Sequence, residues 1–201
     1  MRIPARTGLT LACCAALAII SLSLVHQMTR ERLEAARQQW LLQGLSAVLP
    51  EGPYDEDPLS SRRMITAPEL GSTQALPLYT VYRDRQPLAA VLSVIAPDGY
   101  NGDIRLLLGV RPDGQIIGAR VTEHRETPGL GDDIEIIRSD WITQFAGRSL
   151  QHDTASAWAV TRFGGHFDSL TGATITPQAV ITAIHRALQW YQQHRDEVFS
   201  S

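Results

Sequence analysis

The run from position 7 to position 29 holds no Asp, Glu, Lys or Arg, and no other feature limits the possible folds as strongly. At about 1.5 Å per residue, a helix of this length reaches across a hydrocarbon layer roughly 30 Å thick. Every face of the run is apolar, which disfavours a helix buried in a soluble core. A lipoprotein signal is disfavoured because Cys13 comes early in the run, and a cleaved signal peptide because no clear Ala-x-Ala site follows. We expect one retained transmembrane helix at 7–29.

This helix divides the chain into four predicted segments. They are an amino-terminal segment at 1–6, the membrane helix at 7–29, a membrane-proximal helix and linker at 30–74, and a folded domain at 75–201. Residues 29–44 are favourable for a helix, whereas residues 51–58 are acidic and rich in turn formers. Arginines lie on both sides of the apolar run, so charge alone does not give the orientation.

Short apolar runs separated by turn residues fill the first half of the folded domain. The pattern predicts strands at 78–82, 89–95, 104–110 and 115–122. The second strand is expected to end before Pro97, and Asp113-Gly114 marks a hairpin turn. A closing helix is predicted from Pro177, with one apolar stripe made by Ile181, Ile184, Leu188 and Tyr191. Strands followed by helices indicate an α+β domain built on an antiparallel sheet with packed helices.

Composition excludes several kinds of chemistry. All 18 basic residues are arginine, which rules out Schiff-base lysines, a P-loop lysine and the Ser-x-x-Lys acylation motif. Cys13 and Cys14 both lie in the apolar run, so the folded domain has no disulfide, thiol nucleophile or cysteine-ligated metal. The formal net charge of −3 gives no basic field for nucleic acid, and the histidines show no paired metal-ligand spacing.

The sequence Asp-Ser-Leu-Thr-Gly-Ala-Thr at 168–174 lies directly before the closing helix. Pro177 suits the first helical position, and Thr176 is expected to cap the turn before it. Small residues allow a close backbone approach, and the free N–H groups of a helix start favour an anion. These properties favour a phosphate near the Thr174 hydroxyl. From the residues alone, an ordinary capped helix start is the alternative.

Two further segments are candidates for a binding site. The block Glu-His-Arg-Glu-Thr-Pro-Gly-Leu-Gly at 123–131 alternates restricted and permissive backbone positions. From the residues alone, a surface turn between Thr122 and Ile134 is the alternative, and the block fails the G-x-G-x-x-G dinucleotide pattern. In Gly99-Tyr100-Asn101-Gly102, Tyr100 either contacts a cofactor or is a partly buried ring bonded to a loop carbonyl.

Together these segments resemble a known family. Asp-x-x-Thr-Gly-Ala-Thr resembles the flavinylation motif of the FMN-binding domain family, and Thr-Pro-Gly-Leu-Gly resembles that family's other signature. With Tyr100 and Trp141 at compatible spacings, the resemblance covers about positions 75–195. With its apolar segment included, the whole chain is similar to the G subunits of Rnf/Rsx ion-translocating electron transport complexes. It is less similar to the C subunits of sodium-translocating NADH:quinone reductases.

The resemblance implies FMN attached to Thr174 through a phosphodiester bond. A separate magnesium-dependent flavin transferase, which uses FAD and releases AMP, is implied to recognise Asp168, Thr171, Gly172 and Ala173. The loop implied to lie against the flavin ring consists of Thr127, Pro128, Gly129, Leu130 and Gly131. Tyr100 is implied to lie near the cofactor, and Glu126 to orient the loop rather than to transfer a proton.

The resemblance also implies a function and a location. The chain is expected to be a redox subunit without catalytic residues of its own, relaying electrons between other membrane subunits of the complex. It is expected to be a single-pass protein of the bacterial inner membrane, with a cytoplasmic amino terminus and a periplasmic domain. Two other interpretations are a scaffolding domain without flavin and a membrane-anchored hydrolase using Ser169 or Thr171. The hydrolase is weakly supported because neither hydroxyl has a local base and Gly-x-Ser-x-Gly is absent.

Overall fold

The computed structural model describes residues 3–200, and for residues 3–6, 28, 31, 32 and 34–38 it describes the backbone only. The side chains of the expected amino-terminal segment 1–6 therefore all lie outside the described part of the chain. The chain divides into one unit at Met1–Leu42 and a compact unit at Gln43–Ser201. Each unit is described by itself below.

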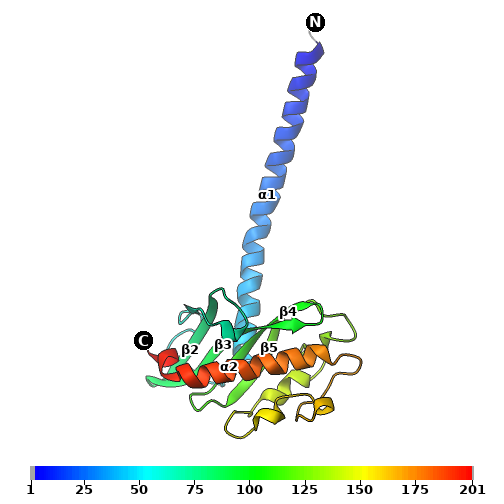
Figure 1. Cartoon of the computed structure of the whole chain (residues 1–201). Helices are drawn as coiled ribbons and strands as arrows, with labels where there is room; N and C mark the ends of the chain where they lie inside the picture. The colour runs from blue at the N-terminus through cyan, green and yellow to red at the C-terminus, as the bar shows by residue number, and fades with distance from the viewer. Residues whose placement is uncertain (1–2, 201) are drawn as a thin grey trace. The chain divides into compact units, whose positions relative to one another are not determined.

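The first unit is helical throughout its described part. Helix α1 spans Ile3–Ser46, so the predicted membrane helix and membrane-proximal helix are one continuous helix whose last turn belongs to the second unit (Figure 1). Within it, Thr7–Gln27 is long and apolar enough to cross a membrane, and none of this stretch is buried by other parts of the chain. Such exposure suits a segment whose apolar side chains face lipid.

The second unit is built on one antiparallel sheet of five strands in the order β1-β2-β3-β4-β5. The strands are β1 (Arg63–Ile65), β2 (Leu76–Arg83), β3 (Gln86–Gly99), β4 (Gly102–Val110) and β5 (Ile116–Glu123). This confirms the predicted α+β class and the four predicted strands. The short edge strand β1 was not predicted.

The turns between strands follow the residues that favour them. Gly114 has a φ of 89° in the predicted turn between β4 and β5. Asp84 and Arg85 adopt φ values of 54° and 61°, and their backbone N–H groups both donate to the Asp55 carboxylate. The prediction that Pro97 ends a strand was wrong, because β3 continues to Gly99 through an irregularity in its pairing with β4. Proline is tolerated where a ladder is irregular, since no N–H is required there.

One face of the sheet is covered by α2 (Ile175–Phe199), which crosses it as Figure 1 shows. The predicted stripe is confirmed, since Ile181, Ile184, Leu188 and Tyr191 are at most 2% exposed. Five 3-10 helices complete this layer: η1 (Pro68–Leu70), η2 (Asp132–Ile134), η3 (Trp141–Phe145), η4 (Ala155–Ala157) and η5 (Thr161–Phe163). Together they enclose the main hydrophobic core of the domain.

The other face is covered by the chain that precedes β1. Leu45, Val48 and Leu49 are buried, although sequence analysis placed them in a linker. They fit because Gly109 of β4 and Gly118 of β5 are register partners and leave a notch in the sheet. A Cβ at Gly109 would lie 1.8 Å from the Val48 carbonyl oxygen. The compact unit begins at Gln43, so it includes this segment as well as the domain expected at 75–201.

Candidate functional site

The segment 168–174 forms a tight turn before α2. Leu170 and Ala173 make an isolated antiparallel bridge, and the Ala173 N–H donates to the Leu170 carbonyl at 3.2 Å. Gly172 takes a φ of 78°, which explains a glycine at this position because other residues adopt that conformation at a cost. The turn leaves Asp168, Thr171 and Gly172 exposed and Thr174 half-buried.

Helix α2 begins two residues earlier than predicted. Its first residue is Ile175 and its N-cap is Thr174, so the prediction that Thr176 caps a helix starting at Pro177 was wrong. Pro177 is the third helical residue, which is acceptable because the first-turn N–H groups have no partner within a helix. An N-cap threonine usually accepts a hydrogen bond from the second or third N–H, but Pro177 has none and Thr174 makes no capping bond.

The loop 126–131 is held by bonds at both of its ends. The Leu130 and Gly131 N–H groups both donate to the Thr127 carbonyl, and the Gly129 N–H donates to Asp132 Oδ1 at 2.6 Å. His124 precedes the loop and Glu135 follows it, and His124 Nε2 lies 2.6 Å from Glu135 Oε1. His124 Nδ1 accepts the Glu126 N–H, so a neutral His124 carries its proton on Nε2 and donates it to Glu135.

The loop and the turn are in direct contact. A Cβ at Gly172 would lie 2.9 Å from Leu130 Cδ2, and a Cβ at Gly131 would lie 3.0 Å from Thr176 Oγ1. The Thr176 hydroxyl, which is 1% exposed, donates to the carboxylate of Glu126. The two blocks that sequence analysis singled out therefore form one site, although about forty positions separate them in the chain.

The third segment joins the same site through its backbone. Tyr100 and Asn101 are the two turn residues between β3 and β4, and the Asn101 N–H donates to Glu126 Oε1 at 3.0 Å. The Asn101 side chain donates to Thr127 Oγ1 at 3.0 Å. The Tyr100 ring is 66% exposed, so the alternative of a partly buried tyrosine bonded to a loop carbonyl was wrong.

Asp168 is held by its main chain. Its carbonyl accepts the Trp141 Nε1–H at 2.6 Å, and its N–H donates to Gln144 Oε1 at 2.8 Å. Its carboxylate and the hydroxyls of Ser169 and Thr171 have no hydrogen-bond or ionic partner among residues 3–200. Exposed polar groups without a partner within the fold are available to bind another molecule. Trp141 was expected in a short helix and at a spacing compatible with the family, but neither its bond to Asp168 nor Gln144 was predicted.

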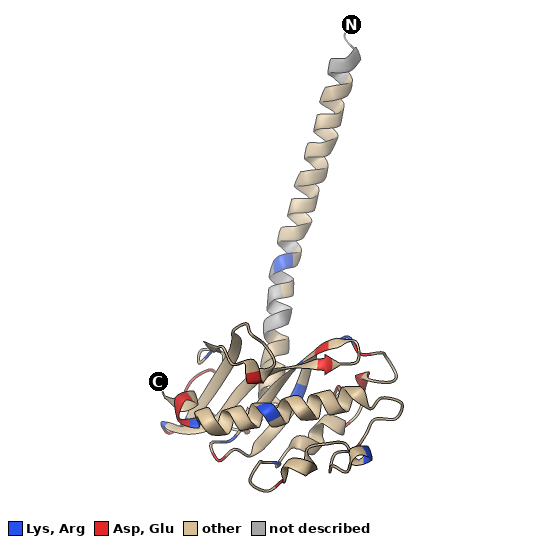
Figure 2. Ribbon diagram, in the orientation of Figure 1, with Lys and Arg blue, Asp and Glu red and all other residues tan. Residues whose placement is uncertain are grey.

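The residues present fit an FMN group. Large hydrophobic residues are exposed on each of the three joined segments: Leu130 is 44% exposed, Ile175 is 52% exposed and Tyr100 is 66% exposed. The first turn of α2 contains no acidic residue, and Figure 2 shows no charged residue at the start of that helix. A phosphate at Thr174 would therefore meet the positive end of the helix dipole, in a turn whose Thr176 hydroxyl already donates to the Glu126 carboxylate. A flat aromatic ring system can lie on the exposed apolar side chains.

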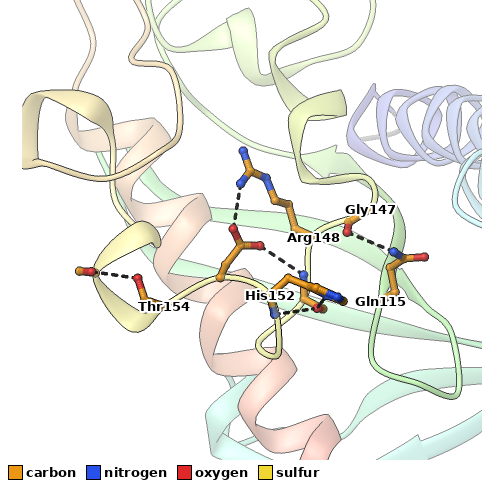
Figure 3. Close-up of polar contacts among 8 residues, drawn as sticks. Gln115, Gly147, Arg148, His152 and Thr154 are labelled. Atoms are coloured by element: carbon orange, nitrogen blue, oxygen red, sulfur yellow. Dashed lines mark hydrogen bonds and ion pairs between the residues drawn. The ribbon is translucent and has the colours of Figure 1, made fainter.

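Ser149, His152 and His185 lie outside this site, and each of their side chains contacts a neighbouring residue. Ser149 Oγ lies 2.8 Å from His152 Nδ1, and the neighbouring Arg148 pairs with Asp153 at 2.9 Å (Figure 3). The Ser149 hydroxyl also accepts the His152 N–H, so it closes a local turn. His185 stacks on Trp158 with ring centroids 5.2 Å apart, and burial lowers the pKa of His185. Among the side chains that the structure describes, no group of three or more His, Cys, Asp or Glu is placed to hold a metal.

Comparison with known proteins gives consistent matches. The model of the FMN-binding domain family matches residues 99–189. The G subunit of an ion-translocating oxidoreductase complex from Vibrio parahaemolyticus is 40% identical over 97% of this chain and 92% of that protein. Its counterpart from Shewanella oneidensis is 39% identical over 97% of this chain and 92% of that protein. The crystal structure of Shewanella oneidensis NqrC covers 73% of this chain and 76% of that one, with 22% identity and a TM-score of 0.48.

Proposed function

Because the chain belongs to the family of ion-translocating oxidoreductase complex G subunits and contains an FMN-binding domain, we propose that it relays electrons through FMN attached covalently to Thr174. When bound, FMN supplies the electron-transfer chemistry, and the protein supplies position and electrostatic environment. The electrons enter and leave through other membrane subunits of the complex. This chain acts as a redox component of that assembly rather than as an enzyme alone.

One observation carries the proposal: the Thr174 hydroxyl makes no capping bond at a helix start where one of its two usual backbone donors is missing. Thr174 is the N-cap of α2 and makes no capping bond, and Pro177 supplies no N–H at the third helical position. The hydroxyl is therefore available as an acceptor for a phosphoryl group. A phosphodiester there keeps one negative charge, which the helix dipole favours by about 0.3–1 kcal/mol. This energy is small, so the covalent bond provides the permanence.

We propose that a flavin transferase performs the attachment. The Thr174 oxygen forms a bond to the phosphorus on the FMN side of FAD, the pyrophosphate bond breaks, AMP leaves and the hydroxyl proton is released. The exposed Asp168 carboxylate and Thr171 hydroxyl, which have no partner among residues 3–200, are the groups that the transferase recognises. Trp141 and Gln144 hold the Asp168 main chain, which presents this turn in one conformation.

After attachment, the loop Thr127-Pro128-Gly129-Leu130-Gly131 holds the ring system. Leu130 contacts Gly172 and is 44% exposed, so it offers an apolar surface beside the attachment segment. Tyr100 lies on the turn that is bonded to the same loop through Asn101. These groups position the cofactor and exclude water from one side of it.

We also propose a location for each part of the chain. Thr7–Gln27 anchors the protein in the bacterial inner membrane, with residues 1–6 in the cytoplasm and the compact unit in the periplasm. Alkaline phosphatase fused after Ser201 should be active in intact cells. A cytoplasm-specific reporter that is active at the same position contradicts this orientation.

The test of attachment uses full-length protein expressed with its transferase. Wild-type protein should show flavin fluorescence in a denaturing gel, and Thr174→Val should show none while it unfolds at the wild-type temperature. Thr161→Val, which replaces an exposed threonine outside the motif, is the matched control and should remain fluorescent. Fluorescence that persists in Thr174→Val rejects this attachment site. Wild-type protein that is colourless after expression with the transferase favours the scaffolding function instead.

A further inference from the structure

Glu126 is a buried carboxylate without a cationic partner among the described residues. It is 5% exposed, its Oε1 accepts the Asn101 N–H at 3.0 Å, and its Oε2 accepts the Thr176 hydroxyl. Burying a charged carboxylate is costly unless its oxygens are hydrogen-bonded, and here two neutral donors perform that task. The two hydrogen bonds therefore tie the Glu126 side chain to both donors.

The two donors come from two different elements, and Glu126 itself lies in a third. Asn101 is in the turn between β3 and β4, and Thr176 is in the first turn of α2, two residues after Thr174. The space around the carboxylate is also matched to it. A Cβ at Gly99 would lie 3.0 Å from Oε1, and a Cβ at Gly131 would lie 2.9 Å from Oε2. Glycine at both positions leaves the carboxylate room to reach its donors.

The geometry points to Glu126 as the positioning residue of the flavin site. Its two hydrogen bonds fix the loop 127–131 against the start of α2 and against the β3–β4 turn. The inference rests on the proposed function, since the loop is the part of the chain proposed to hold the flavin ring. Glu126 acts through that loop and does not itself react. Loss of its hydrogen bonds should leave FMN attached to Thr174 but less well shielded.

Two substitutions at position 126 distinguish the effect of the hydrogen bonds from the effect of the charge: glutamine removes only the charge, and alanine removes both. In Glu126→Gln, the amide oxygen can accept the Asn101 N–H, and the amide N–H can donate to Thr176 Oγ1. Glu126→Ala removes both interactions, and Thr176→Val removes one of them from the other side. Each of the last two variants removes at least one hydrogen bond to a charged group, so the loop should open at least about tenfold more often in both.

The first readout needs no flavin. Hydrogen exchange is measured on full-length protein in detergent, in a Thr174→Val background that carries no cofactor, for the peptide that covers residues 127–131. Glu126→Ala and Thr176→Val should each raise the exchange rate about tenfold or more, and the two together should give no further increase. Glu126→Gln should stay close to the parent protein.

The second readout uses flavin-loaded protein and acrylamide quenching of flavin fluorescence. Quenching should increase in Glu126→Ala and not in Glu126→Gln, with intact mass showing attached flavin in both. Ser149→Ala is the matched control, because Ser149 is buried and its hydroxyl is hydrogen-bonded to His152, which is not a residue of the site. It should lower the unfolding temperature and leave both readouts unchanged.

Three results overturn the inference. They are an unchanged exchange rate in Glu126→Ala, equal effects of glutamine and alanine at position 126, and an equal effect of the Ser149→Ala control. A wild-type protein without attached flavin contradicts the proposed function, whereas the exchange measurement still decides whether Glu126 fixes the loop. The two failures are therefore distinguishable.

Discussion

Gly109 and Gly118 allow the segment 43–50 to pack on the sheet, so a side chain added at either position should lower the stability of the domain. In Gly109→Ala, the new Cβ would lie 1.8 Å from the Val48 carbonyl oxygen, whereas ordinary contact begins near 3.4 Å. The segment must therefore withdraw by roughly 1.5 Å from its place on the sheet. Overpacking of this kind costs about 1–3 kcal/mol. Full detachment would expose Leu45, Val48 and Leu49, each worth about 1.5–3 kcal/mol.

We expect a loss of about 2–4 kcal/mol in the free energy of unfolding for Gly109→Ala, because partial withdrawal lies between these limits. For a domain of this size, the loss lowers the unfolding temperature by about 4–16 °C. Gly118→Ala is the graded comparison, since its Cβ would lie 3.2 Å from the Ala47 carbonyl oxygen, and it should cost under about 1 kcal/mol. The assay is thermal unfolding of the full-length protein in detergent, followed by tryptophan fluorescence. Equal unfolding temperatures for Gly109→Ala and wild type would refute the reasoning.

Three further predictions concern the site and its surroundings. Asp168→Asn should slow flavin attachment several-fold without lowering the unfolding temperature, because the carboxylate is exposed and has no partner among residues 3–200; full attachment at the wild-type rate contradicts its role in recognition. Trp141→Phe should lower stability by about 1 kcal/mol through loss of the bond to the Asp168 carbonyl, measured by denaturant unfolding. Burial lowers the pKa of His185 in the folded state, so the unfolded state binds the proton more tightly. The free energy of unfolding should therefore be highest above the ordinary histidine pKa of about 6.5 and should decrease as the pH falls below it. In His185→Gln, the free energy of unfolding measured by denaturant should depend less on pH over that range.

Much of the fold follows from local patterns in the sequence. The alternation of apolar residues gave four strands, the Asp113-Gly114 pair gave a hairpin, and a stripe of period 3.6 gave the buried face of α2. Strand β1 was missed because it is three residues long and carries an exposed Arg63 and Met64, which show no alternation. Short edge strands depend on their neighbours more than on their own composition.

The extent of the domain was harder to predict, because it depends on a contact distant in sequence. Nothing near Leu45 or Val48 distinguishes them from the apolar residues of a stalk. Their burial follows from the absence of side chains at Gly109 and Gly118, about sixty positions later, which leaves room for the backbone at Val48. A single sequence does not show that these glycines face that segment.

Some residues of the site were predicted from family motifs, and the helix start beside them was predicted from residue preferences. The two blocks were identified by resemblance, and their direct contact follows from the structure. The start of α2 was misplaced because proline suits more than one position in a first helical turn. The bond between Glu126 and Thr176 joins positions fifty apart, so sequence analysis assigned Glu126 only a general orienting role and gave Thr176 the wrong one.

Peptide mass mapping of the native protein tests the central proposal most directly. Full-length protein is expressed with its transferase, digested, and the peptide that contains Thr174 is fragmented. We expect this peptide to carry the mass of one FMN less one water, with the modification localised to Thr174. An unmodified peptide, or a modification localised to Ser169 or Thr171, would contradict the account.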